Sequence, residues 1–312
     1  MLGRWGKDAG SLLGVEITPP FIRLVQLRRH RGGYCVQAWA LEPLPAAAMH
    51  NGWIGDVQQV GACLLQAVQR RVGTACRAAI ALPAGLIIEK QVAMPVGFDD
   101  HAIAESLSTD VGPFIPFALE DAAIDFQIVG IDPDDPQRQH VLVAACHLAL
   151  LDTLQASLEV AGVHACAVEP DAHALHRAVR PSVAGGELLL QLEADTLVFH
   201  ERGPEPVLLR REVPMQCQGD AVPALVATVD NYLLSRSGRA LPEQLLLCGA
   251  GVPGVHLCDE LQQRLGIAVS AVDPFQGMSL APGLEAQALM AQAPSLAIAC
   301  GLAMREGERC LV

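Results

Sequence analysis

Two histidines spaced three residues apart form one arrangement in this sequence that could hold a metal. His173 and His176 fall on a predicted helix, and His164 and Cys166 come shortly before them. Imidazole nitrogens on one helix face, with a thiolate nearby, are ligands that zinc uses. No further ligand follows at a matching spacing, so a polar helix face explains the pair more simply and we expect no metal site.

The common catalytic motifs are absent from the sequence. It contains no G-x-S-x-G nucleophile elbow. The only two lysines, Lys7 and Lys90, lie outside any glycine-rich turn that could act as a phosphate-binding loop. Acidic neighbours such as Asp99 and Asp100 are accounted for by the start of a helix, where carboxylates are favourable. The residues therefore favour a binding protein over an enzyme.

The composition limits the class of protein. A chain of 312 residues predicts two domains. Its 34 acidic and 21 basic residues give a net charge of -13, which opposes binding to nucleic acid. Ten cysteines occur without any C-x-x-C pair, which predicts buried free thiols in a reducing cytosol. No signal segment or apolar run of about 18 residues is evident, so we expect membrane contact only through a partner.

The predicted strands and helices that would position any site occur in the same order in both halves of the chain. In the first half we predict strands at 12–17, 21–27, 34–41 and 77–82 and helices at 57–71, 148–161 and 172–179. In the second half we predict strands at 187–192, 196–200, 207–211 and 244–248 and helices at 221–234, 254–265 and 295–304. Two β-β-β-α-β-α halves, 1–180 and 181–312, predict an α/β protein with mixed sheets and the duplicated RNase H-like fold of actin, hexokinase and Hsp70.

One stretch, 84–140, does not fit this repeat. It contains a predicted strand at 86–94, a helix from the acidic pair at 99–100 to about residue 109, and further strand near 122–129. A proline-rich acidic loop follows at 132–136. We interpret this stretch as a small subdomain inserted into the first half.

Several short stretches resemble a known family in order and spacing. They read LLGVEI at 12–17, ALEPLP at 40–45, IPF at 115–117 with AIDF at 123–126, VLVAAC at 141–146, LCGAG at 247–251 and IACGLAMR at 298–305. Together they resemble PilM, the actin-like family of type IV pilus assembly, which is itself similar to the cell-division protein FtsA. The resemblance covers the chain from near residue 10 to near residue 305.

The resemblance implies a role and a set of partners. Family members sit at the cytoplasmic face of the inner membrane and capture the N-terminal tail of PilN, a membrane protein with one span. PilO- and PilC-type platform proteins and the pilus motor ATPases are further partners that it implies. The stretch 84–140 would correspond to the FtsA-type subdomain 1C, and the short link between Val213 and Ala221 implies that subdomain 2B is reduced or absent.

The resemblance also implies where a nucleotide would bind, and the sequence departs from the family pattern there. Actin-like ATPases hold phosphates with two D-x-G hairpins, since glycine lets backbone N–H groups approach and the aspartate positions a metal and water. The first hairpin has Glu16 for the aspartate and two prolines, which carry no N–H, at its tip. The second has Glu193 where glycine should lie. We therefore expect no ATP hydrolysis, and weak binding of ATP with magnesium is left open.

Two groups of residues follow from this reading as candidate sites. The vestigial nucleotide site comprises Glu16, Thr18, Gln191, Glu193, Gly249 and Gly251. The partner-peptide groove, expected between the first half and its insert, comprises Lys90, Phe114, Ile115, Pro116 and Phe117. For the phenylalanines, the core of the insert is an equally good interpretation, and Lys90 could be a solvated strand residue.

The sequence therefore predicts a scaffold of type IV pilus assembly that holds a PilN-like tail and has lost ATP hydrolysis. Two alternatives stay open. One is a nucleotide-driven ATPase of the same fold, and the other is a module related to the cytoplasmic domain of a type II secretion platform protein.

Overall fold

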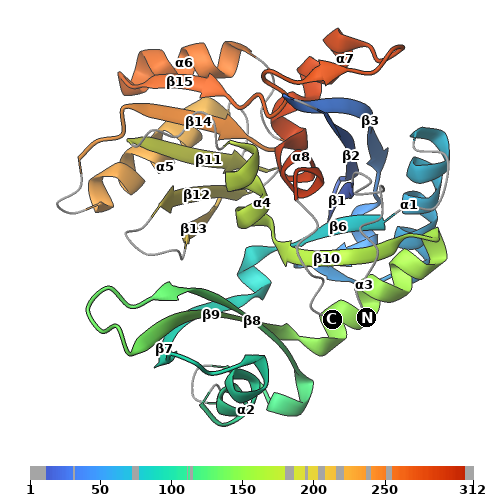
Figure 1. The fold of residues 1–312 in the computed structure, drawn as a ribbon. Coiled ribbons are helices and arrows are strands. Elements are labelled where there is room, and N and C mark those ends of the chain that lie inside the picture. Colours follow the sequence, from blue (N-terminus) through green and yellow to red (C-terminus); the bar gives the residue numbers. More distant parts are fainter. Residues whose placement is uncertain are drawn as a thin grey trace.

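The computed structural model describes most of the chain. The described residues are 12–30, 32–71, 77–110, 112, 115–179, 186–193, 196–202, 208–215, 221–236, 240–250 and 255–305. They form two large sheets, a small third sheet and the helices that cover them (Figure 1). Phe114 and Gly251, both predicted site residues, lie outside the described residues.

The first large sheet has the strand order β10-β6-β1-β2-β3-β16. Its strands are β1 Leu13–Thr18, β2 Phe21–His30, β3 Gly33–Pro43, β6 Arg77–Leu82, β10 His164–Pro170 and β16 Ser279–Leu280. Strands β1, β2 and β3 form an antiparallel meander, whereas β6 and β10 are added in parallel. Helices α1 (Val57–Arg71) and α3 (Leu148–Ala161) cover one face of this sheet and share a core with it.

Helix α3 shows how local sequence sets an element. Its buried residues Leu150, Leu154, Leu158 and Ala161 recur at helical spacing, so they form one apolar stripe. The helix ends at Gly162, whose φ of 65° is in the left-handed region that glycine adopts without strain. The stripe faces α1 and the first sheet, which fixes how this helix packs.

The second large sheet repeats the pattern of the first, with the order β13-β12-β11-β14-β15. Its strands are β11 Glu187–Leu192, β12 Thr196–Arg202, β13 Leu208–Pro214, β14 Gln244–Cys248 and β15 Ala268–Ala271. An antiparallel meander is again followed by two parallel strands. Helices α5 (Ala221–Ser235) and α6 (Val255–Leu265) pack against it. The predicted mixed-sheet, actin-like α/β fold is confirmed.

Two short helices lie between the large sheets. These are α4 (Asp171–Ala178) and α8 (Ala297–Ala303), and their apolar residues join strands of both sheets in one core (Figure 1). The helices approach very closely, because a Cβ at Gly301 would lie 1.8 Å from the carbonyl oxygen of Ala174. A Cβ at Gly14 would likewise lie 1.9 Å from the carbonyl oxygen of Ala299. Glycine at both positions therefore allows α8 to pack closely against α4 and against β1.

The end of the chain packs differently from the predicted division at residue 180. Strand β16 pairs with β3, and α7 (Ala286–Gln292) and α8 share a core with β2 and β3 of the first sheet. The predicted second half thus contributes a strand and two helices to the first sheet. The physical reason is that an apolar pattern predicts an element's type but not which of two similar sheets it will cover.

One segment, Ala286–Ala303, is long and apolar enough by composition to cross a membrane, which the sequence reading did not anticipate. In the structure this segment is α7, a turn and α8 rather than one straight helix, and 56% of it is buried. Residues of α8 are buried throughout. Its apolar character is accounted for by the core it occupies.

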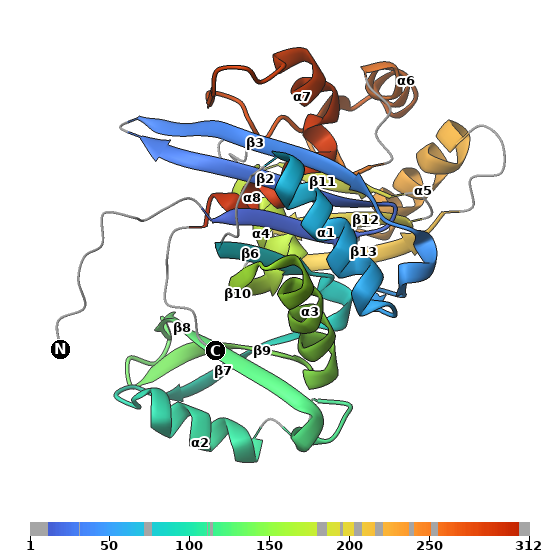
Figure 2. The ribbon, with the colours of Figure 1, turned by 90° about the vertical axis from the view of Figure 1, so that its right-hand side faces the viewer.

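The third sheet is small and lies below the first sheet in both views (Figure 1, Figure 2). Its strands are β7 Ile88–Pro95, β9 Arg138–His147 and β8 Ala122–Ile131, in the order β7-β9-β8. Helix α2 (Asp100–Asp110) covers one face with a small core of its own. This sheet runs past residue 140 to His147. A short hairpin, β4 Met49–His50 and β5 Trp53–Ile54, lies near α1 and α3.

The cysteines are free wherever the structure describes them. They are Cys35, Cys63, Cys146, Cys166, Cys248, Cys258 and Cys300, and all but Cys63 are buried. The predicted buried free thiols are confirmed for this part of the chain.

Candidate functional site

The hairpins β1-β2 and β11-β12 carry acidic side chains that meet at one cation. Glu16 lies on β1 directly opposite Arg23 on β2. The Arg23 Nη1 donates to Glu16 Oε1 at 2.9 Å, and its Nη2 lies 3.8 Å from Glu193 Oε2. The side chains of Arg23 and Glu16 are only 1% and 4% exposed. One buried guanidinium therefore links the first large sheet to the second.

A third carboxylate lies close to this pair. Asp171, the first residue of α4, accepts a hydrogen bond at Oδ1 from the backbone N–H of Ala84 at 3.0 Å. Burial raises the pKa of Asp171, and nearby Arg210 opposes that rise. Burial also raises the pKa of Glu16 to about 7, since it outweighs the attraction of Arg23, and the charges of Glu193 and Asp171 add to the rise. Three acidic side chains, Glu16, Asp171 and Glu193, thus lie close together where the two large sheets meet.

The first hairpin tip leaves little for a phosphate to bind. Thr18 pairs with Phe21, so that Pro19 and Pro20 form the turn between them. Neither proline has an N–H to donate. The carbonyl of Thr18 accepts from Arg23 at 3.4 Å. The strand end is therefore held by the protein's own arginine.

The second hairpin is also bonded within the protein. The N–H of Glu193 donates to the carbonyl of Thr196 at 2.9 Å. Gln191 donates from Nε2 to Glu193 Oε1 at 3.1 Å and accepts from His200 Nε2 at 3.0 Å. Burial lowers the pKa of His200 to about 3, so its ring is neutral near pH 7.

Gly249 lies beside this hairpin at the end of β14. Its φ is 98°, and a Cβ there would lie 2.4 Å from the carbonyl oxygen of Leu192. Its N–H donates to the carbonyl of Pro294 at 2.9 Å. The described residues of the predicted nucleotide site therefore lie close together. One carboxylate oxygen each of Glu16 and Glu193 and the N–H of Gly249 bond within the protein, whereas the second carboxylate oxygens of Glu16 and Glu193 accept no hydrogen bond there.

The sequence reading missed Arg23, Asp171 and Arg210 at this site. Arg23 could have been found, because a tight turn at residues 19–20 pairs position 16 with position 23 across the hairpin. Asp171 and Arg210 come from α4 and β13, and only the folded chain brings Asp171 near Glu16 and Arg210 near Asp171.

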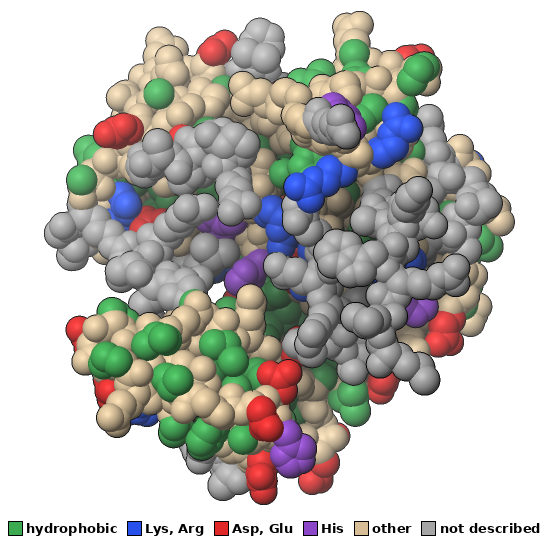
Figure 3. All heavy atoms as spheres, in the orientation of Figure 1, with side chains coloured by type: hydrophobic (Ala, Val, Ile, Leu, Met, Phe, Trp, Pro, Cys, Tyr) green, Lys and Arg blue, Asp and Glu red, His purple; other side chains and the backbone are tan. Residues whose placement is uncertain are grey.

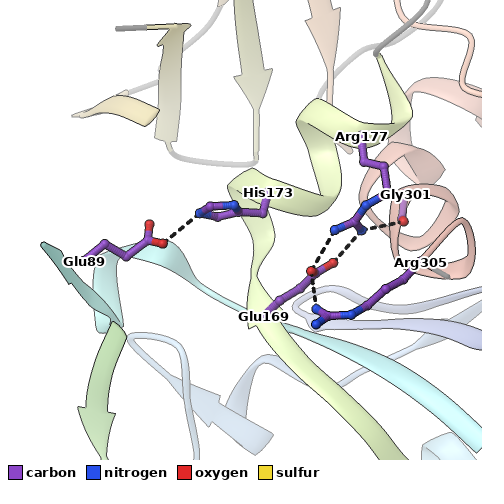
Figure 4. A network of polar contacts seen from close by, with 6 residues as sticks. All are labelled: Glu89, Glu169, His173, Arg177, Gly301 and Arg305. Carbon is purple, nitrogen blue, oxygen red and sulfur yellow. Dashed lines mark hydrogen bonds and ion pairs between the residues drawn. The ribbon is translucent and has the colours of Figure 1, made fainter. Parts of the chain in front are cut away.

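A second polar network ties the small sheet to the body (Figure 4). His173 on α4 shares a hydrogen bond of 2.7 Å, from Nε2 to Oε1, with Glu89 on β7. Glu169 on β10 accepts from both terminal nitrogens of Arg177, at 2.7 and 2.8 Å, and from Arg305 at 2.5 Å. These contacts join β7 to α4, and join β10 to α4 and to Arg305, the second residue after α8.

The two histidines of the sequence reading therefore have structural roles. His173 bonds to Glu89, and the ring of His176 lies 6.0 Å from that of His200. Within the described ranges, no group of three His, Cys, Asp or Glu side chains is placed to hold a metal ion.

The residues predicted for a partner-peptide groove lie on the small sheet, mostly on its α2 side. Lys90 is exposed on β7 opposite Val143, whose side chain is buried beneath α2. Ile115 is 6% exposed and belongs to the same small core. Phe117 is half-buried and stacks on the ring of His147 at 3.9 Å. Pro116 is exposed.

The face of the small sheet that meets the body carries other residues. Glu89 alternates with Lys90 along β7, so it points to the opposite face, where it contacts His173. The structure therefore places Ile115 in the core of the small sheet. Phe117 packs against that core and stacks on His147, whose ring centroid lies 5.6 Å from that of Trp53 on the body.

Comparison with protein families gives one match. The family model described as type IV pilus assembly protein PilM matches residues 14–186 and 221–307.

Comparison with solved structures finds similar folds. The structure named "PilM-PilN type IV pilus biogenesis complex" has a TM-score of 0.77 and 18% sequence identity, and the match covers 96% of this chain and 100% of that one. A diol dehydratase-reactivating factor in nucleotide-free form has a TM-score of 0.53 and 7% identity over 94% of this chain and 99% of that one. Ethanolamine utilization protein EutJ from Carboxydothermus hydrogenoformans has a TM-score of 0.51 and 12% sequence identity. That match covers 94% of this chain and 89% of EutJ. At these identities the likeness is one of fold.

Proposed function

The chain belongs to the PilM family of type IV pilus assembly proteins, and from this membership we propose that it is a scaffold that binds the N-terminal tail of a PilN-like membrane protein without hydrolysing ATP. In this role it links the inner-membrane platform, with PilO- and PilC-type proteins, to the pilus motors. We place it at the cytoplasmic face of the inner membrane, held there by its partner.

The two hairpins carry the proposal that the chain is not an ATPase. Glu193 stands where the family pattern has glycine, and its carboxylate would oppose a bound phosphate at a cost of about 1 kcal/mol per pair of like charges 4 Å apart even in water. Arg23, the cation that could offset this cost, is already hydrogen-bonded to Glu16. The first turn offers prolines in place of backbone donors.

The proposal of a PilN-like partner rests on the family and on one similar structure. That structure has the fold of this chain over nearly its whole length and is named as a complex of PilM with PilN. Prolines form the first hairpin turn and Glu193 stands in the second hairpin, and these departures from the family pattern favour a binding role over catalysis.

The small sheet is the part of the molecule that we propose for the partner. It contacts the body through the hydrogen bond between Glu89 and His173, and it exposes Lys90 and Pro116, two of the residues that the family resemblance indicates. Phe117, next to Pro116 in the sequence, is half-buried.

A titration tests the proposal. A labelled synthetic peptide with the N-terminal sequence of the PilN-like protein from the same organism is added to the purified full chain, and fluorescence anisotropy is recorded. We expect saturable binding, weakened by Lys90→Glu. The exposed, distant change Leu234→Lys on α5 is the control and should leave binding unchanged. Absence of saturable binding to the unmodified chain would remove the proposed partner.

A further inference from the structure

The hairpin formed by β2 and β3 extends beyond the strand next to it. Strand β1 pairs with β2 from Phe21 to Gln26, so residues 27–30 of β2 continue past the end of this pairing. Figure 2 shows this end of the hairpin projecting at the left of the molecule. A Cβ added at Gly32 or at Gly33 would have no atom within 4 Å. The end of the hairpin therefore reaches into open space.

This projecting end is basic, whereas the chain as a whole is acidic. The side chains of Arg28, Arg29 and His30 are all exposed. The stretch 17–41 contains no aspartate or glutamate, although the whole chain has 34 acidic and 21 basic residues. Side chains of Lys and Arg gather over β2 and β3, at the upper right of Figure 3. Positive charge is thus concentrated at one end of the hairpin.

The core holds this end of the hairpin in place. Leu27 and Val36 are buried in the core that β2 and β3 share with α7 and α8. The hydroxyl of Tyr34 donates to the carbonyl of Met304, just after α8, at 3.4 Å. A strand that the core fixes therefore carries the two arginines.

The directions of the arginine side chains select the shape of a partner. Arg28 and Arg29 are neighbours on β2, so their side chains point to opposite faces of the hairpin. A groove or a single anion on one face would contact one of them, whereas a flat anionic surface that meets the hairpin end-on can contact both. Residues 28–33 contain no apolar side chain that could insert between lipid tails. The contact would therefore be electrostatic.

We propose that the end of the β2-β3 hairpin is a membrane-contact site, at which Arg28 and Arg29 bind the head groups of anionic phospholipids. This inference rests on the proposed function, which places the chain at the cytoplasmic face of the inner membrane. It adds a direct contact with the lipid surface to the contact made through the partner.

The expected strength of this contact suits a protein that a partner already holds at the membrane. The cytoplasmic leaflet has a negative surface potential, and each basic residue close to it strengthens binding about fivefold. Charges are screened over about 10 Å at 0.1 M salt, so the acidic body does not prevent a contact confined to the tip. Because the partner keeps the effective concentration at the surface high, a weak contact is enough to orient the chain.

Sedimentation with vesicles tests the inference on the purified full chain. Sucrose-loaded vesicles of phosphatidylglycerol and phosphatidylethanolamine supply the anionic surface, and vesicles of phosphatidylcholine supply a neutral one. We expect the chain to sediment with the anionic vesicles alone, and added salt should weaken this binding. Arg28→Glu combined with Arg29→Glu should weaken it at least about tenfold, whereas Arg28→Lys combined with Arg29→Lys should retain it.

A matched control carries the same change of charge away from the tip. Arg70 and Arg264 are 65% and 44% exposed, and Arg70 pairs with Glu42, which lies opposite Ile22 at the other end of the hairpin. Arg70→Glu combined with Arg264→Glu should lower vesicle binding by no more than about twofold. An equal loss in the tip and control variants would mean that net charge governs binding and that the site is wrong. Equal sedimentation with both kinds of vesicle, or none with either, would also overturn it.

Nucleic acid is the competing anion. A labelled single-stranded DNA oligonucleotide is titrated into the same chains, and we expect no binding because the net charge of -13 opposes it. If the oligonucleotide binds through Arg28 and Arg29 while the anionic vesicles do not, the assignment to a membrane is wrong.

The peptide titration separates this inference from the proposed function. The double variant Arg28→Glu with Arg29→Glu should bind the PilN-like peptide as tightly as the unmodified chain does, which also shows that it is folded. If peptide binding is intact and the unmodified chain does not bind anionic vesicles, the membrane contact is wrong while the partner stands. If the vesicles bind through the two arginines and the peptide does not bind, the partner is wrong while the membrane contact stands.

Discussion

The guanidinium of Arg23 lies 2.9 Å from the carboxylate of Glu16, and both side chains are almost completely buried. The same guanidinium reaches toward Glu193 on the other large sheet at 3.8 Å. Charges removed from water are costly unless they are paired, so each of these groups depends on the others. The contact therefore links the two large sheets through their first hairpins, β1-β2 and β11-β12.

Removing Arg23 should destabilise the protein in a way that depends on pH. Arg23→Met leaves the buried Glu16 without its partner, and we expect the free energy of unfolding to fall by about 3 kcal/mol at pH 8. At pH 5.5, where Glu16 is mostly protonated, the loss should be smaller. Urea unfolding at both pH values measures this. Equal losses at the two values would mean that Arg23 acts through packing alone.

Glu16 should make stability decline as the pH rises. Its pKa in the folded protein is about 7, above the value of 4.5 for an unperturbed glutamate, so the folded state binds the proton more tightly. The contribution is complete below pH 4.5 and is lost as the pH rises through 7, for a total of about 3 kcal/mol.

The variant Glu16→Gln isolates this effect. Burial lowers the pKa of His200 to about 3, and this gives an opposite slope over part of the same range. The quantity to measure is therefore the difference in unfolding free energy between the unmodified chain and Glu16→Gln from pH 4.5 to 8. A difference that stays constant over this range would contradict the assigned cause.

Magnesium-ATP should not stabilise the protein. A ligand that binds only the folded state at one hundred times its dissociation constant adds about 2.7 kcal/mol, which raises the melting temperature by several degrees. Because Arg23 is paired with Glu16 and prolines form the first hairpin turn, we expect no shift with millimolar nucleotide. Thermal unfolding with and without Mg-ATP measures it, and the PilN-like peptide, expected to raise the melting temperature, is the positive control.

Gly301 should not tolerate even a methyl group. The Cβ of an alanine there would lie 1.8 Å from the carbonyl oxygen of Ala174, so α4 and α8 would have to separate. We expect Gly301→Ala to lower the free energy of unfolding by about 3 kcal/mol. The control is Gly112→Ala, because no described atom lies within 4 Å of the corresponding Cβ. Chemical denaturation of both variants provides the comparison.

The sequence predicted which helices and strands form better than it predicted which of them lie next to one another. The repeated strands and helices could be predicted for two reasons. The apolar residues of α1 and α3 recur at helical spacing, and turn residues separate the strands within each meander. The position of β16 beside β3 could not be predicted, because a strand of two residues has no sequence pattern that indicates which strand it pairs with. Strand pairing over long sequence distances is decided by the packed core rather than by local preference.

The candidate sites show the same limit. Glu16 and Glu193 could be placed near one another from the duplicated fold, but the sequence does not reveal that one arginine spans them. Period-two alternation puts Glu89 and Lys90 on opposite faces, yet only the structure shows that the face of Glu89 meets α4. Lys90 was predicted from its match to the family, and the segment 114–117 from its apolar residues. Residue type alone does not distinguish a small core from a binding surface.

The contact between His173 and Glu89 should hold the small sheet to the body most strongly at acidic pH. Burial lowers the pKa of His173, but its hydrogen bond to Glu89 and the charge of Glu89 outweigh this, so the net pKa is raised. The stabilisation is complete below about pH 6.5 and is lost as the pH rises through the folded-state pKa. We expect His173→Gln to cost about 1 kcal/mol at pH 6 and less at pH 9. Hydrogen exchange of β7 amides measures the loosening, with the exposed His101→Gln on α2 as control. If His173→Gln changed exchange equally at both pH values, the imidazolium would have no part in the contact.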